Sequence, residues 1–168
     1  MKIGAIILVF AIFYTGLMAG IFFTWTNAVT PGIGKLSDMG YLRALQSMNR
    51  VILNTSFRIV FIGAVIAVAL VPLFYYQTFP NNIFWTFIAV FIIYWIGVFA
   101  VTFLGNIPIN RMLDNTNLET ISIEDAKNLR MAIENKWNNL NLIRTITSGI
   151  SFLLLILSLL NIEYDKNI

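Results

Sequence analysis

The sequence predicts an all-α protein, specifically a four-helix transmembrane bundle with cytoplasmic amphipathic helical extensions. Apolar residues make up 58% of the 168 positions and charged residues only 11%, a composition typical of proteins that cross the membrane several times. Four stretches without a charged residue, 3–25, 59–76, 83–104 and 145–162, are each about as long as a membrane-spanning helix. These stretches and their connections occupy nearly the whole chain, so we expect one integral membrane domain over residues 1–168.

The first apolar stretch begins directly after Lys2, and we interpret it as a retained helix. It is longer than the apolar part of a signal peptide, and no small-residue cleavage site follows it. Gly16 and Gly20 lie four residues apart within it. This spacing allows a neighbouring helix to approach closely.

The second and third apolar stretches are predicted to form an antiparallel helical hairpin. The short turn between them contains Pro80, Asn81 and Asn82, residue types that favour turns. Pro72 lies inside the second stretch and predicts a local kink in that helix.

Each of the two longer connections is predicted to contain an amphipathic helix. In the first, Ser37 or Asp38 is a suitable N-cap for a helix over about residues 39–53. In the second, Ser122 and Asp125 resemble a capping box. Apolar residues follow at spacings of three or four, without proline or glycine before Gly149. We therefore expect one long helix that runs into the fourth span.

The basic residues predict the orientation of the bundle in the cell membrane. With four spans, both termini and the turn at 77–82 lie on one side, which holds only Lys2 and Lys166. The other nine basic residues lie on the opposite side: Lys35, Arg43, Arg50, Arg58, Arg111, Lys127, Arg130, Lys136 and Arg144. The positive-inside rule predicts that the two longer connections are cytoplasmic and that both termini are non-cytoplasmic.

The composition excludes several classes of function. The chain contains neither histidine nor cysteine, which removes the usual ligands of haem, zinc and copper and the thiol nucleophile. We therefore expect no metal site and no cofactor. The absence of charge within the spans argues against ion transport. The basic residues do not cluster on a soluble surface, so no nucleic-acid partner is expected. The expected partner is the lipid bilayer. The sequence is compatible with a monomer or with a homo-oligomer.

Polar residues gather where the spans leave the bilayer on the predicted cytoplasmic side. The candidate ligand-binding residues are Asn27, Gln46, Asn49, Asn106, Asn110, Trp137, Asn141 and Arg144. Residues 137, 141 and 144 share one helix face. One interpretation is structural: such residues satisfy helix-end carbonyls or reach lipid headgroups. The other is a polar-topped pocket for a flat apolar ligand, with aromatic walls from Phe22, Phe23, Trp25, Phe57 and Phe61.

Four of these segments together resemble the anthrone-oxygenase-like proteins, also called the domain of unknown function 1772 family. They are residues 19–31, residues 46–49 with Asn54, residues 106–110, and Trp137 with Asn141 and Arg144. The resemblance implies a four-span fold. Fungal members are linked to oxidation of an anthrone to an anthraquinone without a metal or organic cofactor. The resemblance further implies that five residues stabilise an enolate or phenolate oxygen of the substrate: Arg144, Trp137, Asn110, Asn106 and Asn49. It does not identify the general base.

Two hypotheses for the function follow. The first is a cofactor-independent, oxygenase-like membrane protein that acts on an aromatic or quinone-like lipophile. The second is a non-enzymatic binding or accessory protein whose polar layer is structural or docks a partner. The first requires a ligand-sized cavity beneath Trp137, Asn141 and Arg144, whereas a structural layer is filled by its own side chains.

Overall fold

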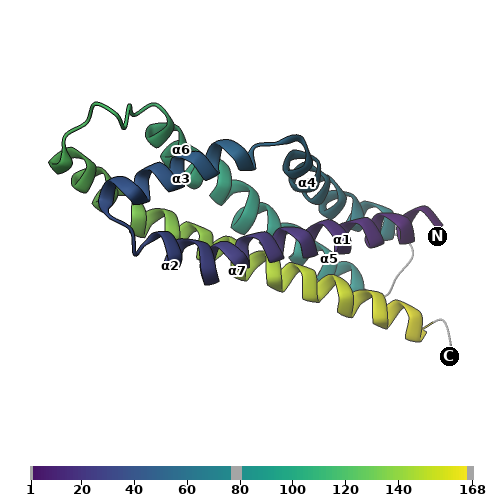
Figure 1. The fold of residues 1–168 in the computed structure, drawn as a ribbon. Coiled ribbons are helices and arrows are strands. Elements are labelled where there is room, and N and C mark those ends of the chain that lie inside the picture. The colour runs from purple at the N-terminus through teal and green to yellow at the C-terminus, as the bar shows by residue number, and fades with distance from the viewer. Residues whose placement is uncertain (1, 77–80, 166–168) are drawn as a thin grey trace.

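The computed structural model describes residues 2–76 and 81–165, and every regular element in these two ranges is a helix. The elements, with η marking π-helical segments, are α1 (Lys2–Thr24), η1 (Trp25–Val29), α2 (Thr30–Ile33), α3 (Asp38–Ile52), α4 (Thr55–Tyr75), α5 (Asn81–Tyr94), η2 (Trp95–Ala100), η3 (Thr102–Asn106), α6 (Ile107–Asp114) and α7 (Ile123–Asp165). Figure 1 shows this arrangement. The all-α prediction is confirmed.

Four helical stretches are long and apolar enough to cross a membrane: Ile3–Ile33, Thr55–Tyr75, Asn82–Asp114 and Ile123–Ile162. The chain is therefore a multi-pass membrane protein, as predicted. Three of the four helices extend well past the predicted spans, because helical hydrogen bonding continues where the uncharged run ends. Six of the polar residues predicted for the site lie in these extensions: Asn27, Asn106, Asn110, Trp137, Asn141 and Arg144.

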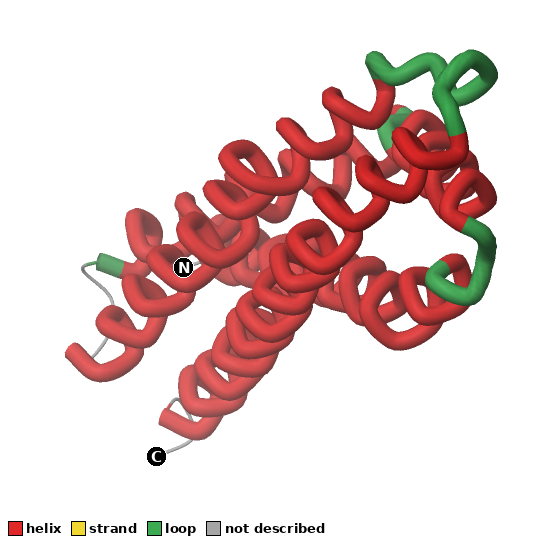
Figure 2. Tube along the Cα trace, turned by 90° about the vertical axis from the view of Figure 1, so that its left-hand side faces the viewer, coloured by secondary structure: helices red, strands yellow, loops and turns green. Residues whose placement is uncertain are grey.

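The long helices run alongside one another with both termini at the same end of the molecule (Figures 1 and 2). Helix α1 packs against α4 and α7, and α5 packs against α7 and α4. Leu8, Val68, Phe87 and Leu155, one from each of these helices, are buried in the shared apolar core. The opposite end carries α2, α3, α6 and the loop 115–122 (Figure 1), and we call it the α3 end.

The α3 end has a smaller apolar core of its own. Ser37 caps α3 by accepting a hydrogen bond from Gly40 N at 3.2 Å. Tyr41, Leu42 and Leu45 are fully buried in a cluster that also contains Trp137 of α7. The predicted amphipathic helix is confirmed, and it ends within one residue of the expected position.

Helix α7 is one continuous helix from Ile123 to Asp165. At its start, Ser122 Oγ accepts from Asp125 N at 3.0 Å and donates to Asp125 Oδ2 at 2.7 Å. The predicted N-cap at Ser122 and the long helix are confirmed; the Asp125 carboxylate accepts from the Ser122 hydroxyl, whereas a capping box has it accept from the Ser122 backbone N–H. Of the predicted hairpin turn, residues 77–80 lie outside the described residues, and Asn81 begins α5. Helix α4 continues through Pro72 as far as Tyr75.

Arg130 of α7 holds the turn between α2 and α3. Its Nη1 donates to Leu36 O at 2.8 Å and its Nη2 to Gly34 O at 2.7 Å. It also pairs with Asp38 at 3.1 Å and with Glu134 at 2.7 Å. The same guanidinium lies 4.7 Å from the centre of the Tyr41 ring. Burial and the nearby Glu134 carboxylate raise the pKa of Tyr41, so that phenol stays neutral.

Small residues set how closely α7 approaches its neighbours. A Cβ at Gly97 of η2 would lie 2.3 Å from Thr147 Cγ2, and one at Gly16 of α1 would lie 2.9 Å from Phe152 Cε2. A Cβ at Gly20 would meet nothing within 4 Å. Of the two glycines expected to allow close packing in the first span, only Gly16 is in such a contact.

Candidate functional site

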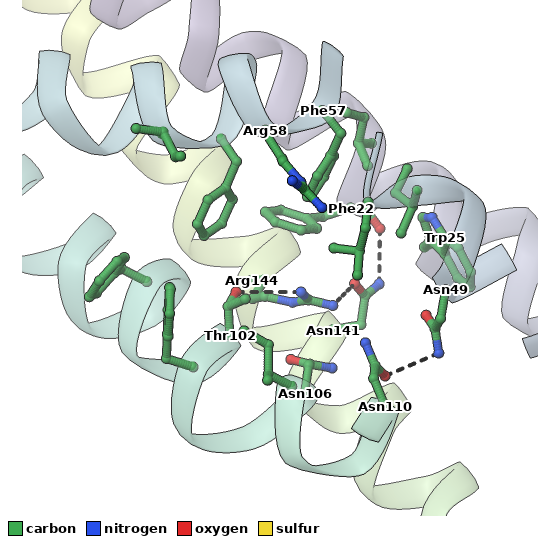
Figure 3. Close-up of a pocket in the computed structure, with 18 of the residues that line it drawn as sticks. Phe22, Trp25, Asn49, Phe57, Arg58, Thr102, Asn106, Asn110, Asn141 and Arg144 are labelled. Carbon is green, nitrogen blue, oxygen red and sulfur yellow. Dashed lines mark hydrogen bonds between the residues drawn. The ribbon is translucent and has the colours of Figure 1, made fainter. Parts of the chain in front are cut away.

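A cavity of about 300 Å³ lies between α1, α4, η2–η3 and α7, beneath the end of α3 (Figure 3). Its walls are mainly apolar and aromatic, with rings from Phe22, Trp25, Phe57, Phe61, Phe99 and Phe103. The polar lining groups lie together toward the α3 end. This volume is at the lower limit of typical small-molecule sites.

The π-helical segments position part of this lining. Each of the three described π segments contributes residues to the cavity: Trp25 from η1, Phe99 from η2, and Thr102 and Asn106 from η3. The wider turn is closed by bonds from Thr30 N to Trp25 O and from Ile107 N to Thr102 O. Pro31 and Pro108 directly follow these closing residues. A proline has no N–H and clashes with the carbonyl four residues back, so the preceding turn widens.

Arg144 of α7 is 7% exposed and lines the cavity. Its Nη2 donates to Asn141 Oδ1 at 2.8 Å and its Nη1 to Thr102 Oγ1 at 3.4 Å. The buried Nε has no partner among the described residues. No carboxylate lines the cavity. The guanidinium therefore keeps an uncompensated positive charge in an apolar setting, which is a functional-site feature in a membrane protein.

Asn141 connects Arg144 to α1. Its Nδ2 donates to Phe22 O at 3.0 Å and to Thr26 Oγ1 at 2.8 Å, while its Oδ1 accepts from Arg144. Thr26 Oγ1 in turn lies 2.9 Å from Thr145 Oγ1. Both ends of the Asn141 amide are thus satisfied within the protein. The amide thereby links the guanidinium group of Arg144 to α1.

Asn110 connects α6 with α3 and α7. Its Oδ1 accepts from Trp137 Nε1 at 2.8 Å and from Asn49 Nδ2 at 3.1 Å. Trp137 and Asn49 are both buried, and all three residues line the cavity. This group closes the cavity at the α3 end. The indole of Trp137 also packs against that of Trp25, with ring centres 5.1 Å apart.

Asn106 differs from the other amides. It is 1% exposed, yet neither its Nδ2 nor its Oδ1 has a hydrogen-bond partner among the described residues. The side chain lies in the cavity wall near Arg144 (Figure 3). A buried amide without partners is costly. Asn106 therefore places an amide group without internal partners in the cavity wall.

Comparison with known proteins gives one result. Residues 50–154, more than half of the chain, match the model of the family described as anthrone oxygenase. The chain belongs to the anthrone oxygenase family. No curated protein and no solved structure matches it. In this anthrone oxygenase family member, the matched part includes Asn106, Asn110, Trp137, Asn141 and Arg144.

The structure brings together six of the eight sequence-predicted residues of this anthrone oxygenase family member. Asn49, Asn106, Asn110, Trp137, Asn141 and Arg144 all line the cavity. Asn27 is exposed and does not line it. Gln46 binds Leu113 O at 2.7 Å and Thr116 O at 3.1 Å, away from the cavity. Phe23, predicted as a wall residue, is 57% exposed; the other four predicted aromatic residues do line the cavity.

Sequence reasoning missed several residues of the site. Thr102, Phe99 and Phe103 line the cavity from the third span, and Arg58 lines it from the start of α4. A signal for Thr102 exists, since it lies one helical turn before Asn106. In the sequence, Arg58 is one of the basic residues that predict the orientation of the bundle, and no motif marks it as a site residue. Among the described residues, no group of three acidic side chains is placed to hold a metal ion.

Proposed function

We propose that this anthrone oxygenase family member oxidises an aromatic or quinone-like lipophile with dioxygen, using its own side chains to stabilise an oxyanion of the substrate. One observation carries the proposal: the partnerless amide of Asn106 is buried in the wall of an aromatic cavity, beside a guanidinium with no carboxylate. The cavity also favours this hypothesis over a purely structural polar layer, which its own side chains would fill.

The aromatic walls suit a flat substrate. Rings from α1, α4 and η2–η3 surround the space on several sides. A planar ligand held between aromatic rings gains contact area and favourable stacking geometry. The membrane-spanning helices around the cavity suit a ligand that partitions into the bilayer, because lipophiles concentrate there.

Arg144 and Asn106 supply the chemistry in this proposal. An anthrone in its enolate form carries negative charge on one oxygen, and electron-rich anions of this kind react directly with dioxygen. Arg144 Nε and Asn106 Nδ2 both have unused donors, so they stabilise that oxygen by charge-assisted hydrogen bonding. Asn141 and Thr102 keep the guanidinium in place.

The reaction balances without another reactant. The methylene carbon of the anthrone loses two hydrogens and gains one oxygen atom to become a carbonyl. One dioxygen molecule accepts the four electrons, and its second oxygen leaves as water. No carboxylate lines the cavity and the chain has no histidine, so the proton of the anthrone passes to solvent.

The test uses the full chain in lipid nanodiscs with a dihydroxyanthrone as the probe. Oxygen uptake and anthraquinone absorbance are measured together and corrected for autoxidation in empty nanodiscs. We expect protein-dependent turnover that Asn106→Leu reduces about a hundredfold, because the oxyanion loses a positioned donor. Asn27→Leu is the matched control and leaves the rate unchanged, since Asn27 is exposed and outside the cavity. Oxidation no faster than in empty nanodiscs would falsify the proposal.

A further inference from the structure

Arg58 lines the same cavity as Arg144. It lies in the first turn of α4, is exposed, and forms no side-chain hydrogen bond or ion pair with any described residue. Figure 3 shows its side chain extending from α4 toward the space that Arg144 enters from α7. The cavity therefore has one buried and one exposed guanidinium.

The arginines of the described residues fall into two groups, those with a carboxylate partner and those without. Arg43 pairs with Glu119, Arg50 with Asp114, and Arg130 with Asp38 and Glu134. Across residues 2–76 and 81–165, only Arg58, Arg111 and Arg144 have no carboxylate partner, and two of these three line the cavity. A site with two unpaired cations and no acidic lining residue favours an anionic ligand.

The position of Arg58 is at the mouth of the cavity. Three apolar residues that line the same cavity are strongly exposed: Leu53 at 55%, Ile62 at 53% and Phe103 at 48%. Helix α4 packs on α1 and α5 but makes no extensive contact with η2 or η3. The cavity thus opens sideways between α4 and η2–η3, through a lip of apolar side chains with one cation. The aromatic part of a ligand fits inside the cavity, while a charged group of the same ligand stays at the lip.

We infer that Arg58 is a specificity-determining residue that selects aromatic lipophiles bearing an ionised acid group at the edge of the ring system. This inference deepens the proposed function and rests on the cavity holding an aromatic lipophile. Arg144 and Asn106 face the reacting oxygen deep in the cavity, whereas Arg58 binds a second, separate acidic group at the mouth. A guanidinium donates a planar pair of hydrogen bonds to a carboxylate.

The test measures binding rather than turnover. The full chain in nanodiscs of zwitterionic lipid is titrated with anthracene carboxylate and with the matching neutral carboxamide. Energy transfer from tryptophan reports occupancy, because Trp25 and Trp137 line the cavity, and empty nanodiscs are the blank. We expect the carboxylate to bind about tenfold more tightly than the amide. Arg58→Gln removes that preference by weakening carboxylate binding alone, while Arg58→Lys retains part of it.

Arg111→Gln is the matched control. Arg111 is exposed, has no carboxylate partner among the described residues and does not line the cavity, so its loss changes net charge equally and leaves the preference intact. Equal binding of both probes, unchanged in Arg58→Gln, overturns the inference and leaves the proposed function standing. Binding of neither probe overturns both.

A second arm separates a ligand acid from a lipid headgroup. The titrations are repeated in nanodiscs that contain phosphatidylglycerol. If Arg58 only contacts lipid phosphate, Arg58→Gln leaves the ratio of the two probes unchanged in both lipids, which overturns the inference. We expect the ratio to fall in Arg58→Gln in both lipid compositions.

Discussion

The guanidinium group of Arg144 lies 4.5 Å from the centre of the Phe22 ring. This contact joins the fourth span to the first, and the centre of the Trp137 ring lies 5.6 Å from the same group. The two rings attract the cation without neutralising it. Arg144 is thereby held rigidly while its charge remains available to a ligand.

Arg144→Lys should reduce oxidation of a dihydroxyanthrone about tenfold to a hundredfold. A lysine keeps the charge but lacks the planar donors that bind Asn141 and stack on Phe22. Turnover in nanodiscs and thermal unfolding in detergent are measured on the same preparations. Arg111→Lys, on the exposed face of α6, serves as the control with unchanged turnover. Full activity in Arg144→Lys removes Arg144 from the site.

Gly97→Ala should destabilise the bundle by about 1–3 kcal/mol, the usual cost of overpacking. The new Cβ would lie 2.3 Å from Thr147 Cγ2 and 2.5 Å from Thr147 Cβ, so η2 and α7 must separate. Gly149→Ala on α7, the helix that carries Thr147, is the comparison, because a Cβ there meets nothing within 4 Å. That change should be neutral or stabilising. Equal stability of the two variants in denaturant titrations contradicts the close approach.

Arg130→Met should loosen the turn between α2 and α3 at a cost of about 1–3 kcal/mol. The change removes donors to Gly34 O and Leu36 O and leaves Glu134 without its partner. Hydrogen exchange should quicken in residues 34–37 before it quickens elsewhere. Arg43→Met removes an exposed ion pair with Glu119, which contributes little. The hydrogen-exchange pattern of the Arg43→Met variant should match that of the unmodified chain.

Pro108→Ala should lower activity about a hundredfold without lowering stability. Alanine supplies the missing N–H to Leu104 O, so η3 can tighten into an ordinary α-turn. Asn106 then rotates away from the cavity by roughly 100°, a displacement large enough to abolish productive geometry. Pro72→Ala is the control, because Pro72 lies in α4 without a π segment and does not line the cavity. Retained activity in Pro108→Ala means that the proline does not position Asn106.

The orientation in the membrane is a prediction from charge alone, and the absence of cysteine makes it simple to test. Asn117→Cys places a single exposed thiol in the loop at the α3 end. A cysteine appended after Ile168 marks the other side. An impermeant maleimide applied to intact cells should label the appended cysteine but not position 117. The reverse pattern places both termini in the cytoplasm.

The sequence alone determined the elements of this protein with good accuracy. Uncharged runs located the four spans, because the bilayer tolerates only long apolar helices or closed barrels. Ser37 and Ser122 located the starts of α3 and α7, because capping is a local interaction between neighbouring residues. The spacing of Trp137, Asn141 and Arg144 on one face of α7 was likewise a local property.

Only the tertiary structure decided which polar residues share the cavity. Thr26 contacts Asn141, whereas the adjacent Asn27 is exposed. The π segments explain part of this difficulty, because each adds a residue to a turn and shifts every later side chain around the helix. Asn49 and Asn110 meet across 61 positions of sequence, and Arg58 lines the cavity from the start of α4 although it is far from Arg144 in sequence. Packing between distant helices sets these relationships, and no local pattern encodes it.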